Sequence, residues 1–100
     1  MMTLVVFLKI HAGKEAEFTA YEQQAIEIAR THGGVLVKAF QPNMMVGNMP
    51  AVDEVHILTF PSETAFAQFR ADKRFIPLQT LRAEAIQETM IVAGTGTVTY

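Results

Sequence analysis

The sequence contains no cysteine, and only 18% of its 100 residues are Asp, Glu, Lys or Arg. Without cysteine there are no disulfides, no thiolate nucleophile and no cysteine-based metal site. The 8 basic residues are outnumbered by 10 acidic ones, and the formal net charge of −2 gives no electrostatic basis for binding nucleic acid or a membrane surface. An ordinary soluble domain has roughly 25% charged residues. With 50% hydrophobic residues, a monomer would leave apolar surface uncovered, which indicates self-association.

Long hydrophobic runs are also missing. The apolar stretch within residues 3–11, TLVVFLKIH, is far shorter than the roughly 20 residues that a membrane-spanning helix needs. No basic segment of a signal peptide precedes it. We therefore expect a single domain over residues 1–100, located in the cytoplasm and without a membrane partner.

The pattern of apolar residues predicts four strands and two main helices. The strands are 3–11, 35–41, 52–60 and 88–94. The first helix, 14–32, ends at a Gly-Gly pair and repeats these apolar positions at helical spacing: Phe18, Tyr21, Ala25, Ile28 and Ala29. The second helix begins after Ser62 as its N-cap and turns Ala65, Phe66 and Phe69 inward. A further short helix starts at Pro77.

The resulting order, β-α-β-β-α-β, is the ferredoxin-like pattern of an α+β fold, in which a four-stranded antiparallel sheet carries its helices on one face. Such a sheet normally shows a polar second face. Here the strand at 3–11 is apolar on both faces, and the strands at 52–60 and 88–94 are nearly so. The simplest cover is the same face of a second copy, which predicts a homodimer with its two sheets packed together.

Several short motifs are distributed along nearly the whole chain: Gly33-Gly34, Gly47, TFPS at 59–62, Phe69, DKRF at 72–75 and Arg82. Together they resemble the dimeric α/β-barrel superfamily, in which two ferredoxin-like chains close one barrel. They are particularly similar to a family of small bacterial proteins of unassigned function. The spacing from Phe75 to Arg82 also agrees with that family's pattern. The chain departs from that family at Thr59, where the family has glutamate, and at Phe75, where it has tyrosine. Residues 72–74 replace its Ser-Pro-Glu.

The resemblance implies a barrel closed by two chains but does not choose a reaction. The superfamily includes cofactor-free monooxygenases, muconolactone isomerases, haem-degrading enzymes and haem-dependent dismutases, and a shared fold does not decide among them. The sequence has no HExxH, GxGxxG or GxxxxGK motif, so we expect no metal site and no cofactor. A lone histidine is weak support for haem.

His56 is the candidate catalytic residue. Alternation places it on the same face of its strand as Leu58 and Phe60, and opposite Thr59. The helix-covered face of a central strand is a poor environment for an imidazole, which favours the opposite face, inside the barrel between the two chains. The family pattern argues the reverse, because its glutamate at position 59 would then face the helices. We expect the barrel side, where His56 is either a base or a hydrogen-bonded structural residue.

Five further residues are candidates for binding a substrate. On the first strand, Phe7, Lys9 and His11 share the face expected to line the barrel, while the aliphatic set on the other face meets the helices. Lys9 and His11 could orient an anionic ligand or simply emerge into solvent. Thr59 is included because it stands at the family's glutamate position. Arg82 could clamp a substrate carboxylate or serve as a structural bridge.

These features predict a homodimeric barrel that binds a small apolar or aromatic organic molecule, between sheet and helices or between the paired sheets. If the protein is an enzyme, we expect cofactor-free chemistry: His56 removes a proton next to a carbonyl, and a cation holds the oxyanion. Isomerisation or oxygenation would follow. The alternatives are a non-catalytic binding module and a purely structural dimer without a pocket.

Overall fold

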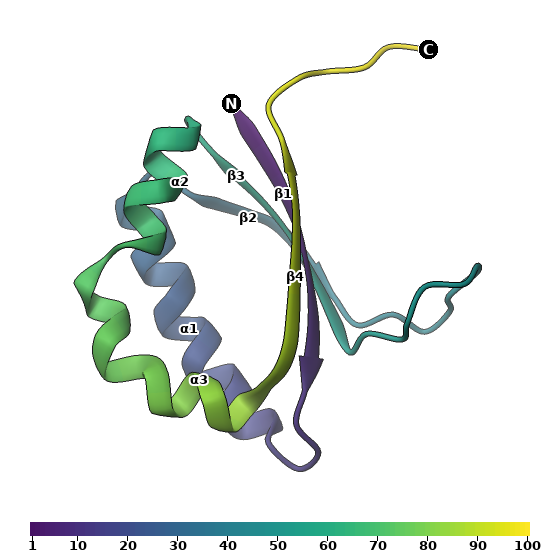
Figure 1. Ribbon diagram of the computed structural model, residues 1–100, viewed down its shortest axis with the longest axis vertical. Coiled ribbons are helices and arrows are strands. Elements are labelled where there is room, and N and C mark those ends of the chain that lie inside the picture. Colours follow the sequence, from purple (N-terminus) through teal and green to yellow (C-terminus); the bar gives the residue numbers. More distant parts are fainter.

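The computed structural model describes residues 1–100 as a sheet covered on one face by helices (Figure 1). The sheet is four-stranded and antiparallel, with the order β2-β3-β1-β4. Its elements in chain order are β1 (Met2–Ile10), α1 (Glu15–Thr31), β2 (Val35–Phe40), β3 (Glu54–Phe60), α2 (Glu63–Arg70), the 3-10 helix η1 (Lys73–Leu78), α3 (Gln79–Ala85) and β4 (Ile86–Gly94). The predicted ferredoxin-like α+β arrangement is confirmed.

Several element boundaries differ from the predicted ones by one or two residues. β3 starts at Glu54, and Asp53 before it also contacts β1: its N–H donates to the carbonyl of Leu8 at 2.8 Å, and its carboxylate accepts from the N–H of Ile10 at 2.7 Å. Pro77 lies inside η1 rather than at the start of α3. Proline has no N–H to donate to an α-helical turn, and the tighter turns of η1 carry the chain through it.

Helix α1 buries all five apolar side chains predicted for its inner face. Beyond its C-cap, Gly33 adopts a φ of 80°, a left-handed conformation that glycine reaches without strain. Gly34 then passes so close to β3 that a Cβ atom there would lie 2.8 Å from the carbonyl oxygen of Ala29 and 2.9 Å from the ring of Phe60. The Gly-Gly pair thus ends the helix and lets the chain turn tightly into β2.

The core lies between the sheet and the helices in two clusters. One packs Leu8 of β1 against Phe18 and Tyr21 of α1. The other joins Leu4 of β1 to Phe60 of β3. β1 therefore turns its aliphatic set toward the helices, as predicted from alternation.

Polar side chains fix the ends of the second helical region. Ser62 caps α2, as predicted, by accepting from the N–H of Ala65 at 3.1 Å. Asp72 caps η1 by accepting from the N–H of Arg74 at 2.9 Å, and it contacts Nε2 of His32 at 2.8 Å. Hydrogen bonds from the side chain of Arg74 and from His32 hold the pKa of the Asp72 carboxyl well below its usual range.

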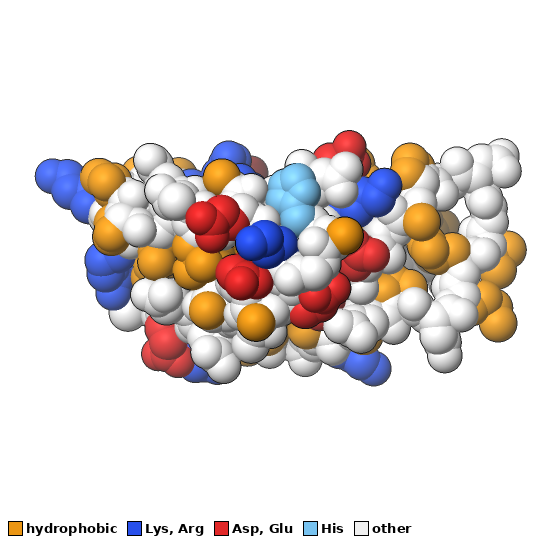
Figure 2. All heavy atoms as spheres, turned by 90° about the horizontal axis from the view of Figure 1, so that it is seen from below, with side chains coloured by type: hydrophobic (Ala, Val, Ile, Leu, Met, Phe, Trp, Pro, Cys, Tyr) orange, Lys and Arg blue, Asp and Glu red, His pale blue; other side chains and the backbone are white.

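The second face of the sheet carries no helix (Figure 1). Its apolar side chains are open to solvent: Phe40 is 41% exposed, Met90 45% and Val92 53%. The connection between β2 and β3 projects on this side (Figure 1). Seen from below, the side chains coloured at the end where this connection projects are hydrophobic, while acidic, basic and hydrophobic side chains intermingle over the rest of the view (Figure 2).

None of the helices combines the length and the apolar character needed to cross a membrane.

We expect Gly34→Ala to lower the free energy of unfolding by about 2 kcal/mol, because the new methyl group would overlap a backbone carbonyl and a core ring. The matched control is Gly94→Ala, where a Cβ meets no atom within 4 Å and the change should stay within about 0.5 kcal/mol. Urea denaturation followed by circular dichroism measures both. Equal midpoints for the two variants would contradict the close approach at Gly34.

A carboxyl whose pKa is lowered by folding stabilises the folded state above its unfolded pKa, and that contribution is lost as the pH falls toward the folded pKa. We therefore expect Asp72→Asn to be less stable than the wild type at pH 7. The difference should shrink as the pH drops below about 4. Unfolding curves between pH 7 and pH 2 measure it, with the exposed Glu84→Gln as control. A difference that does not change with pH would rule out a role for the ionised carboxylate.

Candidate functional site

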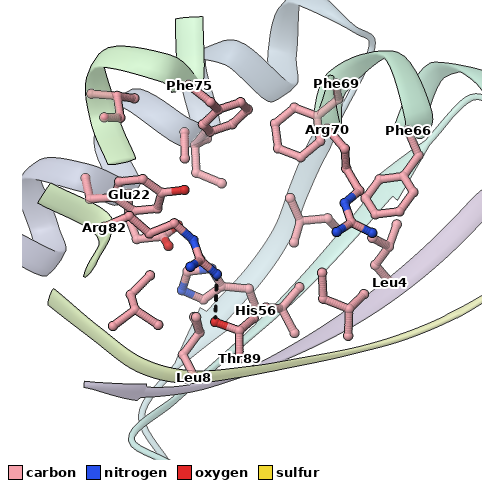
Figure 3. Close-up of a pocket in the computed structure, with 18 of the residues that line it drawn as sticks. Leu4, Leu8, Glu22, His56, Phe66, Phe69, Arg70, Phe75, Arg82 and Thr89 are labelled. Atoms are coloured by element: carbon pink, nitrogen blue, oxygen red, sulfur yellow. Dashed lines mark hydrogen bonds and ion pairs between the residues drawn. The ribbon is translucent and has the colours of Figure 1, made fainter. Parts of the chain in front are cut away.

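A cavity of about 570 Å³ lies between the helices and the sheet (Figure 3). Residues of α1, α2, η1 and α3 form one wall, and residues of β1, β3 and β4 form the other. Of its 21 lining residues, 15 are hydrophobic. This size and lining suit a small, largely apolar organic molecule.

Four phenylalanine rings form a continuous aromatic wall at one side of the cavity. Phe69 is at its centre, with its ring centroid 5.1 Å from that of Phe60, 5.2 Å from that of Phe75 and 6.2 Å from that of Phe66. The rings of Phe69 and Phe75 meet edge to face, and the others are tilted, which are arrangements that aromatic quadrupoles favour. The wall offers ring faces and edges to a flat aromatic ligand.

A buried histidine, His56, lies beside Glu22 at the other side of the cavity (Figure 3). His56 is only 4% exposed. Its Nε2 lies 2.5 Å from Oε2 of Glu54 on the same strand, and its Nδ1 lies 3.6 Å from Oε2 of Glu22 on α1. Both ring nitrogens therefore face carboxylates, and the imidazole joins a side chain of the sheet to one of the helices.

Glu22 is the one carboxyl among the residues that line the cavity, and the cavity shifts its pKa. Burial raises the pKa of Glu22, because the charged carboxylate is poorly solvated there. Attraction to His56 and to Arg82 opposes this shift, and repulsion from Glu54 adds to it. A carboxyl with a raised pKa inside an apolar cavity is well suited to exchange a proton with a bound molecule.

Arg82 on α3 reaches into the same part of the cavity (Figure 3). Its Nη2 donates to Oγ1 of Thr89 on β4 at 3.3 Å, which orients the guanidinium toward Glu22 and His56. Tyr21 lies beside it: burial raises the pKa of the Tyr21 hydroxyl, and the charge of Arg82 partly opposes that shift. The cation, the carboxyl and the imidazole thus meet at one end of a mainly hydrophobic cavity.

Glu22 and His56 also border a second hollow of about 430 Å³ between α1 and β2. Glu54 lines this hollow and not the main cavity. The Glu22–His56 pair consequently separates the main cavity from an opening at the β2 edge of the sheet.

The structure separates the predicted site residues into two groups. His56 and Arg82 line the same cavity. The expectation that His56 points away from the helices is wrong, because its ring contacts Glu22 and Phe18 of α1. Its ring nitrogens face two carboxylates: Glu54, which shares its face of β3 by alternation, and Glu22 of α1, which the sequence argument did not bring to it.

The other candidates lie elsewhere. Phe7 and Lys9 line a different cavity, of about 590 Å³, on the helix-free face of the sheet. Thr59 alternates with the core residues Leu58 and Phe60 and so lies on that helix-free face as well. His11 follows β1 and is bound through its backbone N–H, which donates to the carbonyl of Ala85. None of these four residues lines the cavity that holds His56.

Sequence reasoning did not identify Glu22 as a site residue. The signal was present: Glu22 stands four residues after Phe18 and three before Ala25, both of which are buried. Residues at these spacings share one helix face. A glutamate within a buried stripe needs a polar partner, because burying an unpaired carboxylate is costly. His56 is that partner.

The raised pKa of Glu22 predicts how the stability of the folded protein changes with pH. An acid whose pKa is raised by folding favours the folded state at low pH, and this contribution is lost as the pH rises through the folded pKa. Glu22→Gln cannot ionise, so its stability relative to the wild type should increase from pH 4 to pH 8. Thermal unfolding measures the trend, with the exposed Glu84→Gln as matched control. A trend in the opposite direction would show that attraction to His56 and Arg82 outweighs burial.

The fold is shared with proteins of known structure. A protein of unknown function from Rhodopseudomonas palustris superposes with a TM-score of 0.81 at 17% identity, covering 98% of this chain and 83% of the other. SnoaB, a cofactor-independent oxygenase from Streptomyces nogalater, gives a TM-score of 0.68 at 18% identity, covering 98% and 94%. An uncharacterized NIPSNAP domain protein from Burkholderia xenovorans gives 0.69 at 16% identity, covering 97% and 95%. At such identities the similarity shows the fold alone.

Comparison with functionally curated proteins finds no match. The resemblance to a family of unassigned function with a ferredoxin-like fold is confirmed by a match that extends over residues 4–95. The chain therefore belongs to the family described as Domain of unknown function (DUF1330).

Proposed function

We propose that the protein binds a small aromatic ketone in the cavity between sheet and helices and removes a proton from the carbon next to its carbonyl, without a cofactor. The observation that carries the proposal is Glu22: a carboxyl with a raised pKa, directed into an apolar cavity, beside a cation and a buried imidazole. This combination supplies a base and a stabiliser for the charge that forms.

In this reaction the ionised Glu22 takes the proton. The C–H bond breaks, an O–H bond forms on Glu22, and the electron pair moves through the new C=C bond to the carbonyl oxygen. Arg82 lies where it can hold the resulting enolate oxygen, since its guanidinium lies beside Glu22 and His56 at the same end of the cavity. Returning the proton to another atom gives isomerisation, and combination of the enolate with dioxygen gives oxygenation.

His56 acts in this proposal as a positioning residue rather than as the base. Its Nε2 is held by Glu54 and its Nδ1 faces Glu22, so the imidazole fixes the carboxyl that meets the substrate. SnoaB, a cofactor-independent oxygenase, has the same fold, so the fold is compatible with this class of chemistry, but the proposal is argued from the residues of this chain.

The test uses 2-acetylnaphthalene, an aromatic ketone with an enolisable methyl group. We expect the protein to accelerate exchange of the methyl protons for deuterium in D2O, followed by ¹H NMR. Glu22→Gln should reduce this acceleration on the order of 100-fold, because a positioned base is lost. Arg82→Gln should reduce it by a similar factor, and the exposed Glu84→Gln should leave it unchanged.

Binding without any acceleration of exchange would contradict catalysis and favour a non-catalytic binding module. Absence of binding would favour the purely structural alternative. Equal losses in Glu22→Gln and Glu84→Gln would show that the effect is one of general charge and not of the site.

We also propose that a second copy of the chain covers the helix-free face of the sheet. Met90 and Val92 lie on this face opposite Phe7 and Val5 of β1, and all four side chains are apolar. The exposed fractions of Met90 and Val92 are high for apolar residues in a sheet. A sheet-to-sheet contact would bury them around the cavity that Phe7 and Lys9 line.

At micromolar concentration, analytical ultracentrifugation should give twice the mass of the chain. The double variant Met90→Glu/Val92→Glu should sediment as a folded monomer, because it buries charge in the contact. Val98→Glu, an exposed change beyond β4, is the control and should remain dimeric. A wild-type monomer, or a dimer that survives the double variant, would contradict this interface.

A further inference from the structure

The arginines of the chain differ in whether they have a carboxylate partner. Arg30 forms an ion pair with Glu27, and Arg74 forms one with Asp72. Arg70 and Arg82, the remaining two, form no ion pair with any carboxylate. These two are also the arginines that line the main cavity. The two arginines without a carboxylate partner are therefore the ones that a molecule bound in this cavity would meet.

Arg70 is the last residue of α2 and lies beside the aromatic wall (Figure 3). Its guanidinium carbon is 5.8 Å from the centroid of the Phe66 ring, a cation–π contact that holds the group over the ring face. This contact leaves the N–H donors of the planar guanidinium free. A guanidinium with free donors matches the two oxygens of a carboxylate.

Arg70 and Arg82 are at opposite sides of the cavity, with the aromatic wall beside Arg70 and the Glu22–His56 pair beside Arg82 (Figure 3). A carboxylate on the ligand would be repelled by Glu22 and by Glu54 at the His56 side. At the Arg70 side the structure places no carboxylate among the lining residues. Electrostatics therefore direct an acidic group toward Arg70 and the carbonyl toward Arg82.

We infer that the cavity is a site for an anionic aromatic ketone, whose carboxylate pairs with Arg70 while its carbonyl faces Arg82. Its ring system lies along Phe66 and Phe69. The inference rests on the proposed function for the end of the ligand that reacts. Recognition of the anion by Arg70 does not depend on the proposed function. It follows from the absence of an ion pair at Arg70 and from the place of this residue beside the aromatic wall.

The test compares two ketones that differ in one carboxylate: 6-acetyl-2-naphthoate and 2-acetylnaphthalene. Binding is followed by NMR on the ring signals of Phe66 and Phe69, which line this cavity. Methionine methyl signals report separately on the helix-free face, because Met44, Met45 and Met90 line the other cavity and no methionine lines this one. The two sites are thereby distinguished in one experiment.

We expect the carboxylated ketone to bind the wild type about tenfold more tightly than the neutral one, since a charge-assisted pair is gained. Arg70→Gln should remove that preference and leave the Kd of the neutral ketone within about twofold. Arg70→Lys retains the charge without the planar fork and should keep part of the preference. Arg30→Gln, which does not line this cavity, is the matched control and should keep all of it.

Equal affinities of the wild type for the two ketones, or a preference that survives Arg70→Gln, would overturn the inference. A preference lost in Arg82→Gln but kept in Arg70→Gln would overturn the orientation. Exchange of the acetyl protons is measured in the same samples and reports on catalysis alone. An anion preference without exchange would support this inference and contradict the proposed function, so the two can fail separately.

Discussion

The side chains of β3 alternate between the two faces of the sheet, so the burial of Leu58 and Phe60 in the core fixes the direction of the other side chains of this strand. Leu58 and Phe60 are buried against the helices. Because alternate residues share a face, Glu54 and His56 must then point toward the helices as well. Two polar side chains are thus carried into the layer where the core is formed. The rest of the site follows from the need to accommodate them.

Helix α1 accommodates the histidine by supplying a carboxylate on the other side of this layer. Glu22 lies between Phe18 and Ala25 on the buried stripe, so the helix that covers the sheet also brings Glu22 to His56. Burial of a polar group is costly unless it is paired, and the Glu54–His56–Glu22 contacts provide that pairing. Glu22, which completes the cluster, has a raised pKa and lines the cavity.

The cavity has bulky aromatic side chains on one side and polar side chains on the other. The phenylalanines of β3, α2 and η1 pack on one another, as their centroid distances show. The polar side holds Glu22, His56 and Arg82 in fixed relation through Thr89 and Glu54. A shared fold among proteins of such low identity does not preserve these particular groups, so chemistry must be argued from this chain's own residues.

Local features of the chain were determined by the sequence. The strands, the buried stripe of α1, the Ser62 cap and the left-handed Gly33 follow from periodicity, capping chemistry and glycine's freedom, all of which act between near neighbours. Even the division of β3 into two faces is local. Which face meets the helices is not, because it depends on long-range packing of Phe60 against α2. Only the tertiary structure therefore brought Glu22 to His56, separated both from Lys9 and Thr59, and left Arg70 and Arg82 without ion-pair partners in one cavity.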